Sequence, residues 1–405
     1  AHLSLSLSLS RAPMPVPTAT AHAVPLDGDV TVFAEAVRAT PVWSNPASRQ
    51  HVRGTQYLAG EPYRWPAGLV NSLFKSLDKN CIRFFVIDDS GSMERSDGLR
   101  VERVPNGSCV KVPCTRWREL CDAVSFHAEL AYEAQAPSEF RFLNRGHPIE
   151  IGYADDDRAS LREFQELLRD GPSRGTPLCH HVREIVRRIV SIEDDLRRTN
   201  KKVSLTIFTD GESSDGDLAQ ALKPLERLPC WVVIRLCTNE DRIVQYWNTI
   251  DDNLELEMDV LDDWFGEGAE ITQHNPWLTY GEPLHRFREF GSHYKELDLL
   301  DEAPLNADQL RATLAIVLGG EPNTFPHPTA DLPGLTKHVH RLLESTPPTV
   351  DPKSLGRAGW IVSSRLNGRH GFFSMGSSGL DSAQLLLAAA AVFVGVVMVM
   401  GMLAG

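Results

Sequence analysis

Residues 84–93 read Phe-Phe-Val-Ile-Asp-Asp-Ser-Gly-Ser-Met, an apolar run that ends in a turn. An apolar run of this length, stopped by turn-forming residues, is typical of a fully buried strand in a parallel sheet. The turn holds Asp88, Ser90 and Ser92 at alternate positions. One carboxylate and two small hydroxyls so close together are oxygen ligands of the kind that hard cations prefer. The segment therefore predicts a buried strand that presents a site at its carboxyl end.

Two later segments are candidates to complete this site. Thr176 stands in Gly-Thr-Pro-Leu at 175–178, just before a helical pattern, and the apolar run 203–209 ends at Asp210. In a doubly wound sheet, ligands bind beyond the carboxyl ends of the strands, so Asp88 and Asp210 are expected at one edge. Taken singly, each piece also fits an ordinary solvated loop, because Asp, Ser and Gly are common turn formers. Together and in this order, they resemble the metal-ion-dependent adhesion site of the von Willebrand factor type A (VWA) domain family.

The VWA resemblance covers about residues 78–265 and implies a doubly wound, Rossmann-like α/β fold, with a mostly parallel sheet flanked by helices. It also implies five metal ligands, namely Asp88, Ser90, Ser92, Thr176 and Asp210. Few protein ligands and retained waters suit the octahedral preference of Mg²⁺, with Mn²⁺ or Ca²⁺ as alternatives. In this family the open coordination position receives a Glu or Asp from a partner protein. The resemblance thus implies a metal-dependent protein-binding module rather than an enzyme.

Two other functions fit parts of the same pattern. A scaffold whose metal only stabilises the loops would use the same ligands. A phosphohydrolase of the haloacid dehalogenase class also starts with an apolar strand ending in Asp, but it needs a second Asp two residues later, where Ser90 stands. A phosphate-binding Gly-rich Lys loop, a zinc-protease His pair and a Gly-x-Ser-x-Gly elbow are also absent from the sequence. We therefore expect no catalytic residue. Asp89 and Glu212 flank the site, and neither is expected to be a ligand.

Strand-like and helix-like patterns alternate through the middle of the chain, which is typical of an α/β domain with a parallel sheet. The expected strands are 81–88, 139–143, 149–153, 203–209, 230–237 and 256–261. The expected helices are 117–134, 161–168, 181–198, 218–228 and 243–254. The strands around the Asn-Arg-Gly turn at 144–146 are expected to form a hairpin. The polar stretch that contains Gly98 and Pro105 is expected to be an insertion before the first of these helices.

The regions outside the VWA-like part carry weaker patterns. Residues 1–25 begin with a Leu-Ser alternation and then turn rich in Pro and Ala, so we expect disorder and no secretory signal. Residues 26–77 contain Trp and Tyr residues that are expected to pack on the domain. Residues 266–320 are expected to form a partly helical extension. Residues 321–384 are rich in Pro, Gly and Ser, which predicts a linker or tether.

Residues 385–405 form a run of 21 residues without a charged or strongly polar side chain. At about 1.5 Å per residue, a helix of this length spans the roughly 30 Å hydrocarbon core of a membrane. A buried C-terminal helix of a soluble core would normally carry polar residues on one face. The basic residues Arg357, Arg365 and Arg369 favour a cytosolic flank. We expect a single-pass, tail-anchored protein with its VWA-like part in the cytosol; a glycolipid-anchored cell-surface protein is the alternative.

The formal net charge is −13, from 54 acidic and 41 basic residues, and no block of basic residues stands out. This composition argues against a nucleic-acid partner. Cys109 and Cys114 lie in a polar loop, where a local disulfide would need an oxidising compartment. A zinc site would need these two with Cys121 and a fourth ligand such as His127, and that spacing fits no common zinc pattern. Free thiols in a reducing compartment are the expected state of the seven cysteines.

Overall fold

The structure, a computed structural model, describes residues 50–366 except 104–108, 155 and 239. Within these residues no helix has both the length and the apolar character needed to cross a membrane. The disorder predicted for 1–25 and the membrane span predicted for 385–405 lie outside the described residues. Both therefore stay predictions from the sequence.

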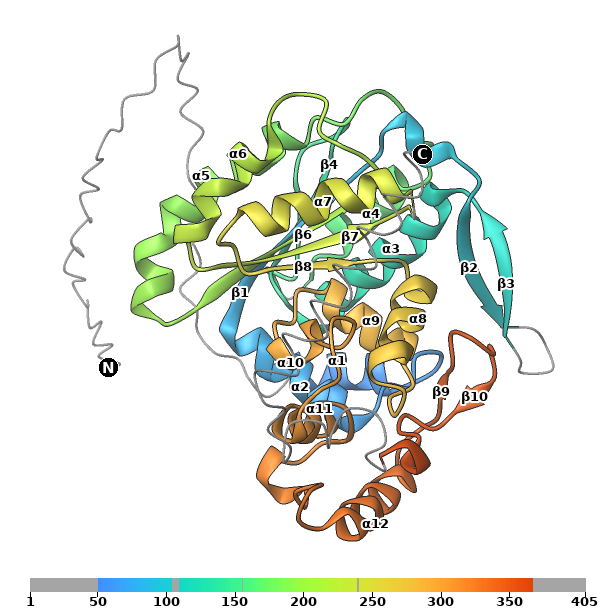
Figure 1. Cartoon of the computed structure of the whole chain (residues 1–405). Coiled ribbons are helices and arrows are strands. Elements are labelled where there is room, and N and C mark those ends of the chain that lie inside the picture. Colours follow the sequence, from blue (N-terminus) through green and yellow to red (C-terminus); the bar gives the residue numbers. More distant parts are fainter. Residues whose placement is uncertain (1–49, 104–108, 155, 239, 367–405) are drawn as a thin grey trace, which may run out of the picture. The chain divides into compact units, whose positions relative to one another are not determined.

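A six-stranded sheet forms the centre of the described chain, in the order β5-β4-β1-β6-β7-β8 (Figure 1). β4 and β5 pair antiparallel, and all other neighbours in this sheet are parallel. The predicted α/β class with a mostly parallel sheet is therefore confirmed, and each expected strand is present. The strands are β1 (Asn80–Ile87), β4 (Ser138–Phe142), β5 (Ile149–Ile151), β6 (Lys202–Thr209), β7 (Cys230–Leu236) and β8 (Met258–Leu261).

Strand β1 requires cover on both sides of the sheet. All eight of its residues are buried, so neither face of the strand is left to solvent. On one face Phe85 stacks on His127 of α3 (Arg116–Ala134), with ring centroids 5.5 Å apart. The long helix α5 (Leu178–Arg198) contacts the neighbouring β6 and buries an apolar stripe. The remaining helices of this region are α4 (Arg158–Leu167), α6 (Leu218–Leu222) and α7 (Asp241–Asn253).

The insertion between β1 and α3 contains a hairpin that the sequence did not predict. β2 (Gly98–Arg103) and β3 (Cys109–Cys114) pair antiparallel, and β2 contacts α3. Polar residues and a proline within β3 leave no clear alternation of apolar side chains, which is why the pattern was missed. The two cysteines at the ends of β3 are separated by roughly 16 Å of extended chain, too far for a disulfide. All seven cysteines are free.

The chain after the sheet folds back against it. The described part of the expected tether, residues 321–366, is folded: Trp360 is only 1 % exposed and its indole N–H donates to the carbonyl oxygen of Pro347 at 2.9 Å. The Pro and Gly residues of this segment separate short elements, which a composition-based reading mistakes for a flexible linker. The helices are α8 (Trp264–His274), α9 (Glu282–Glu289), α10 (Lys295–Asp298), α11 (Ala307–Leu318) and α12 (Leu332–Leu343), and the strands are β9 (Thr349–Val350) and β10 (Arg357–Ala358).

Two helices precede the sheet, α1 (Gln50–Ala59) and α2 (Ala67–Lys79). α1 contacts α3, and α2 contacts α11. Gly68 lets α2 approach the end of α11, because a Cβ at this position would lie 2.1 Å from the backbone nitrogen of Gly319. Between the two helices, Trp65 stacks on Phe126 of α3 with ring centroids 5.9 Å apart. The part of the N-terminal extension that the structure describes therefore packs on the sheet's helices.

A buried ion cluster fastens α9 beneath the sheet. Glu289 is completely buried and accepts hydrogen bonds from Arg286 Nη1 at 2.7 Å and from Arg235 Nε of β7 at 3.2 Å. His127 Nε2 of α3 lies 3.0 Å from the same carboxylate. Burial alone would raise the pKa of Glu289, but the Arg286 charge and the histidines hold this pKa well below its usual range. The next residue back, Arg288, pairs with Asp259 of β8 at 3.0 Å, so consecutive residues of α9 bind two strands.

Replacement of Glu289 by Ala should lower the free energy of unfolding by about 3–5 kcal/mol, because it leaves buried guanidinium groups without their counter-charge. Denaturant unfolding measures the change. Glu282→Ala is the matched control: Glu282 pairs with the same Arg286 at 3.1 Å, but its side chain is 47 % exposed. The control should cost less than about 1 kcal/mol. Equal costs for the two variants would show that the cluster does not hold α9 in place.

Candidate metal centre

Asp88, Asp89 and Ser90 of the turn after β1 are buried, and both carboxylate oxygens of Asp88 accept hydrogen bonds. One carboxylate oxygen of Asp88 accepts from the backbone N–H of Ser90 at 2.9 Å, and the other accepts from the hydroxyl of Thr209 at 2.6 Å. Thr209 ends β6, so the turn is tied to the neighbouring strand. Burial raises the pKa of Asp88 to about 6, and the charge of Asp210 acts in the same direction. Among the described residues, no Lys, Arg or His pairs with the Asp88 carboxylate.

The serines of the turn connect it to Asp210. Ser90 Oγ and Ser92 Oγ lie 3.0 Å apart, and Ser92 Oγ donates to Asp210 Oδ1 at 2.7 Å. Asp210 follows directly on β6 and is 3 % exposed. The parallel pairing of β1 with β6 therefore brings Asp88, Ser90, Ser92 and Asp210 into one cluster, where the sequence predicts them.

Thr176 reaches the same edge through its loop. Ser173 N donates to Asp89 O at 2.7 Å, and Gly91 N donates to Arg174 O at 3.1 Å, so this loop lies along the turn after β1. On its other side Thr176 N donates to Ser214 Oγ at 3.0 Å. The loop is thus held between the turns that follow β1 and β6. Its contacts to both turns are made by the backbone.

Arg116 belongs to this cluster, and the sequence did not reveal it. Its side chain is 1 % exposed, and Nη1 donates to Asp210 Oδ2 at 2.8 Å. The same guanidinium pairs with Asp97 at the start of the hairpin and with Glu240 at 2.8 Å. An Arg at the first position of a helix usually lies in solvent, and no spacing in the sequence links it to an Asp 94 residues away. Each carboxylate oxygen of Asp210 therefore already accepts a hydrogen bond, one from Ser92 and one from Arg116.

Two nearby carboxylates have other partners. Asp89 is completely buried and accepts from Arg145 Nε at 2.6 Å and from the backbone N–H of Asn144 at 2.9 Å. It therefore holds the turn after β4 against the turn after β1. Glu212 pairs with Arg242 at the surface. Both carboxylates therefore already have a cationic partner.

The donor set fits a hard divalent cation. The hydroxyls of Ser90 and Ser92 and the carboxylates of Asp88 and Asp210 gather at the end of the sheet, and the Asp88 charge is buried without a cation among the described residues to match it. Arg116 offsets part of the Asp210 charge, but it also faces Asp97 and Glu240. The local balance therefore stays negative. Ser92 is the partly exposed member of the set, which leaves one side of the cluster towards solvent.

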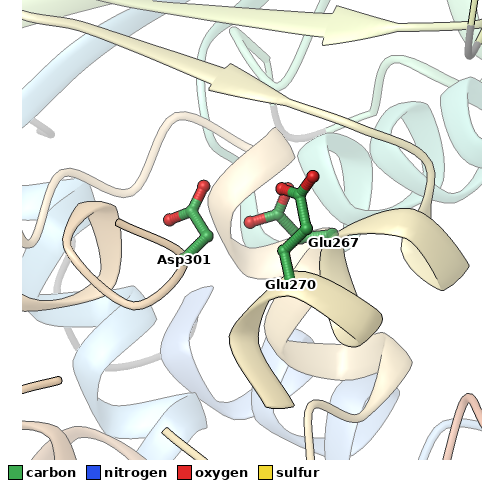
Figure 2. A group of neighbouring side chains, drawn as sticks. All are labelled: Glu267, Glu270 and Asp301. Carbon is green, nitrogen blue, oxygen red and sulfur yellow. The ribbon is translucent and has the colours of Figure 1, made fainter. Parts of the chain in front are cut away.

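A second acidic group lies on the other side of α9. Glu267 and Glu270 of α8 and Asp301, which follows α10, place one carboxylate oxygen each within 4.8 Å of the others (Figure 2). These three residues could hold a metal ion. Arg288 already stands beside them, paired with Glu267 and lying 3.7 Å from Asp301. Burial raises the pKa of Glu267 to about 8, so protons and Arg288 together balance the charge of this group.

The sheet order and the flanking helices make this a mixed α/β protein with a mostly parallel sheet. No protein-family model and no curated protein matches the chain. Among solved structures, the chain is similar to the crystal structure of the SpRpn10 VWA domain, at 10% sequence identity and a TM-score of 0.31. The match covers 45% of this chain and 87% of that chain. The assignment of the candidate site comes from the contacts described above.

Replacement of Arg116 by Met should destabilise the protein by about 3–5 kcal/mol, because Asp210 would keep a buried charge without its partner. Chemical denaturation measures this change. Arg95→Met is the matched control, because Arg95 pairs with the same Glu240 but its side chain is 57 % exposed. Its loss should cost less than about 1 kcal/mol. An Arg116 variant as stable as the Arg95 variant would contradict the ion pairing with Asp210.

Asp298 ends α10 and is subject to the charge of Asp301 in this acidic group, and it predicts a pH dependence. Burial raises the pKa of Asp298 to about 8, whereas an unfolded Asp titrates near its ordinary value of about 4. The folded state therefore binds more protons than the unfolded state between these values, and its stability falls as the pH rises from about 4 to about 8. Asp298→Asn should flatten this fall in unfolding free energies measured from pH 5 to pH 8. Asp308→Asn, at an 82 % exposed carboxylate, should leave the slope as it is. If the curves of unfolding free energy against pH are parallel for the parent and both variants, the raised pKa of Asp298 is refuted.

Proposed function

We propose that this protein is a protein-binding module whose Mg²⁺ is held by Asp88, Ser90, Ser92, Thr176 and Asp210 and accepts an acidic side chain from a partner. The observation that carries the proposal is the buried Asp88 carboxylate without a cationic partner, beside converging hydroxyls. A dication would supply the missing positive charge with the oxygen ligands that Mg²⁺ prefers. Mn²⁺ and Ca²⁺ have the same preference for oxygen.

The charge around the ion favours an anionic ligand from outside. Asp210 shares one oxygen with Arg116, so the two carboxylates do not fully neutralise a dication. The ion would therefore stay electrophilic at an open coordination position, which a Glu or Asp of a partner can fill. Arg174 lies in the loop that hydrogen-bonds to the turn, is exposed, and has no ion-pair partner in the described residues. It would attract the same acidic partner at short range.

The membrane part of the proposal rests on the sequence alone. The apolar run 385–405 would anchor the module as a single-pass, tail-anchored protein, with the binding site in the cytosol. This arrangement would present the metal centre to soluble partners from a membrane surface. A glycolipid anchor at the cell surface is the alternative.

Asp88→Asn should weaken Mg²⁺ binding at least about tenfold, because it removes a full charge from the coordination sphere. Its fold should survive. The amide oxygen can still accept from Ser90, and the amide group can donate to the Thr209 hydroxyl. Without metal, the variant should be as stable as the parent or more stable, since a buried charge is lost. Isothermal calorimetry with Mg²⁺ and thermal unfolding measure the two effects. Asp170→Asn, at a 71 % exposed carboxylate, is the matched control.

Partner capture in Mg²⁺ or in chelator then separates the functions. The binding-module proposal is supported by a partner that meets three conditions. Chelator releases it, the Asp88→Asn variant does not capture it, and changing one of its own acidic residues to the amide abolishes its binding. If chelator lowers thermal stability but leaves the partner bound, the metal is structural and the protein is a scaffold. Turnover of a generic phosphate ester that disappears in Asp88→Asn would instead establish a phosphohydrolase.

A further inference from the structure

A cavity of about 360 Å³ lies away from the metal centre, between α3, the segment at 62–65 and the strands β9 and β10. Its volume is in the range of sites that bind small molecules, roughly 300–1,000 Å³. The C-terminal segment that the sequence predicts to be a tether forms one of its walls, through Thr349, Val350 and Trp360. The cavity therefore exists only because this segment folds back on the sheet's helices.

Helix α3 forms another wall with one face. Asp122, Ser125, Phe126 and Glu129 all line the cavity, and their spacing of three and four residues places them in one stripe of the helix. The ring of Phe126 packs edge-on against Tyr63, with centroids 5.0 Å apart. Together with Trp65 and Trp360, these rings make an aromatic lining around a carboxylate.

Glu129 is the carboxylate of this lining that has no ion-pair partner among the described residues. Its carboxylate accepts from the Tyr57 hydroxyl at 2.8 Å, and the hydroxyls of Tyr57 and Tyr63 lie 2.9 Å apart. No ion pair involves Glu129 within the described residues. Burial raises the pKa of the Tyr63 phenol, the hydrogen bond with Tyr57 lowers it, the charges of Glu129 and Glu282 raise it, and the charge of Arg286 lowers it. Glu129 therefore adds a negative charge without an ion-pair partner to this end of the cavity.

The cations that line the cavity do not cancel this charge. Arg286 is committed to Glu289 at 2.7 Å and to Glu282 at 3.1 Å. Arg64 pairs with Glu61. Arg357 also lines the cavity, but it is exposed, where water screens its charge.

We propose that this cavity binds a small organic cation, an ammonium or amidinium group carried on an apolar or aromatic body. Glu129 would receive the cation, with the two tyrosine hydroxyls completing the hydrogen bonds around it. The rings of Tyr63, Phe126 and Trp360 would contact the body, and aromatic faces attract cations in their own right. The proposal does not depend on the metal centre, because none of the five predicted ligands lines this cavity.

The test uses the full chain and three probes of similar size: 2-phenylethylamine, 2-phenylethanol and 3-phenylpropionate. Calorimetry or tryptophan fluorescence should detect saturable binding of the amine, with the neutral and anionic probes at least about tenfold weaker. Glu129→Gln should reduce amine affinity by at least tenfold while its side-chain oxygen still accepts from Tyr57. Glu133→Gln is the matched control, because Glu133 lies one turn further along α3 and pairs with Arg53 at 3.1 Å. It should bind the amine like the parent.

Ser125→Phe offers a second, steric test, because it fills the cavity without changing its charge. It should abolish amine binding, and a cooperative thermal unfolding transition like that of the parent shows that the variant is folded. The proposal is overturned if the amine does not bind, if 3-phenylpropionate binds as tightly as the amine, or if either Glu129→Gln or Ser125→Phe binds it like the parent. If Glu133→Gln weakens amine binding as much as Glu129→Gln does, the cation binds outside this cavity and the proposal is likewise overturned.

Discussion

The parallel pairing of β1 with β6 is the constraint on which the candidate metal centre depends. Ile87 is in register with Phe208, so the residues that follow each strand emerge side by side. The hydrogen bond from Thr209 to Asp88 closes this edge, and the backbone N–H of Asp88 donates to Phe208 O at 3.0 Å. Two carboxylates from distant parts of the chain are thereby forced together in a buried place. Such an arrangement is costly unless positive charge is supplied.

The chain supplies that charge unevenly. Asp210 has Arg116, which is itself surrounded by further carboxylates, whereas Asp88 has only a backbone N–H and a hydroxyl. The second acidic group shows the opposite solution, because Arg288 stands among Asp259, Glu267 and Asp301. The two groups therefore differ in how their negative charge is balanced. In the second acidic group a guanidinium of the protein lies among the carboxylates, whereas at Asp88 no guanidinium of the described residues does so.

The sequence could predict whatever is local or strictly periodic. The apolar run before Asp88 and the one before Asp210 identify two buried strands, and their common edge follows from the rules of parallel sheets. Arg116 and Glu289 could not be found this way. Their partners lie 94 and 162 residues away, and a charged residue in a helix is normally exposed. Only the packing of α3 and α9 against the sheet turns these residues into buried counter-charges.

The ordered C-terminal segment was missed for a related reason. Its Pro and Gly residues have the composition of a tether, and composition carries no information on whether Trp360 finds a buried place. The indole does so where its N–H donates to Pro347 O, while the backbone carbonyl of Trp360 accepts from the N–H of Thr279.

Helix α3 carries one wall of each proposed site, and the way it is held bears on whether the two sites communicate. Arg116 binds it to Asp210, Glu119 binds it to Arg235, and His127 binds it to Glu289. Communication between sites needs an element with two stable positions. Three buried or part-buried attachments along one helix oppose any second position. The metal centre and the aromatic cavity therefore share a fixed frame, and the occupancy of one site is expected to leave the affinity of the other unchanged.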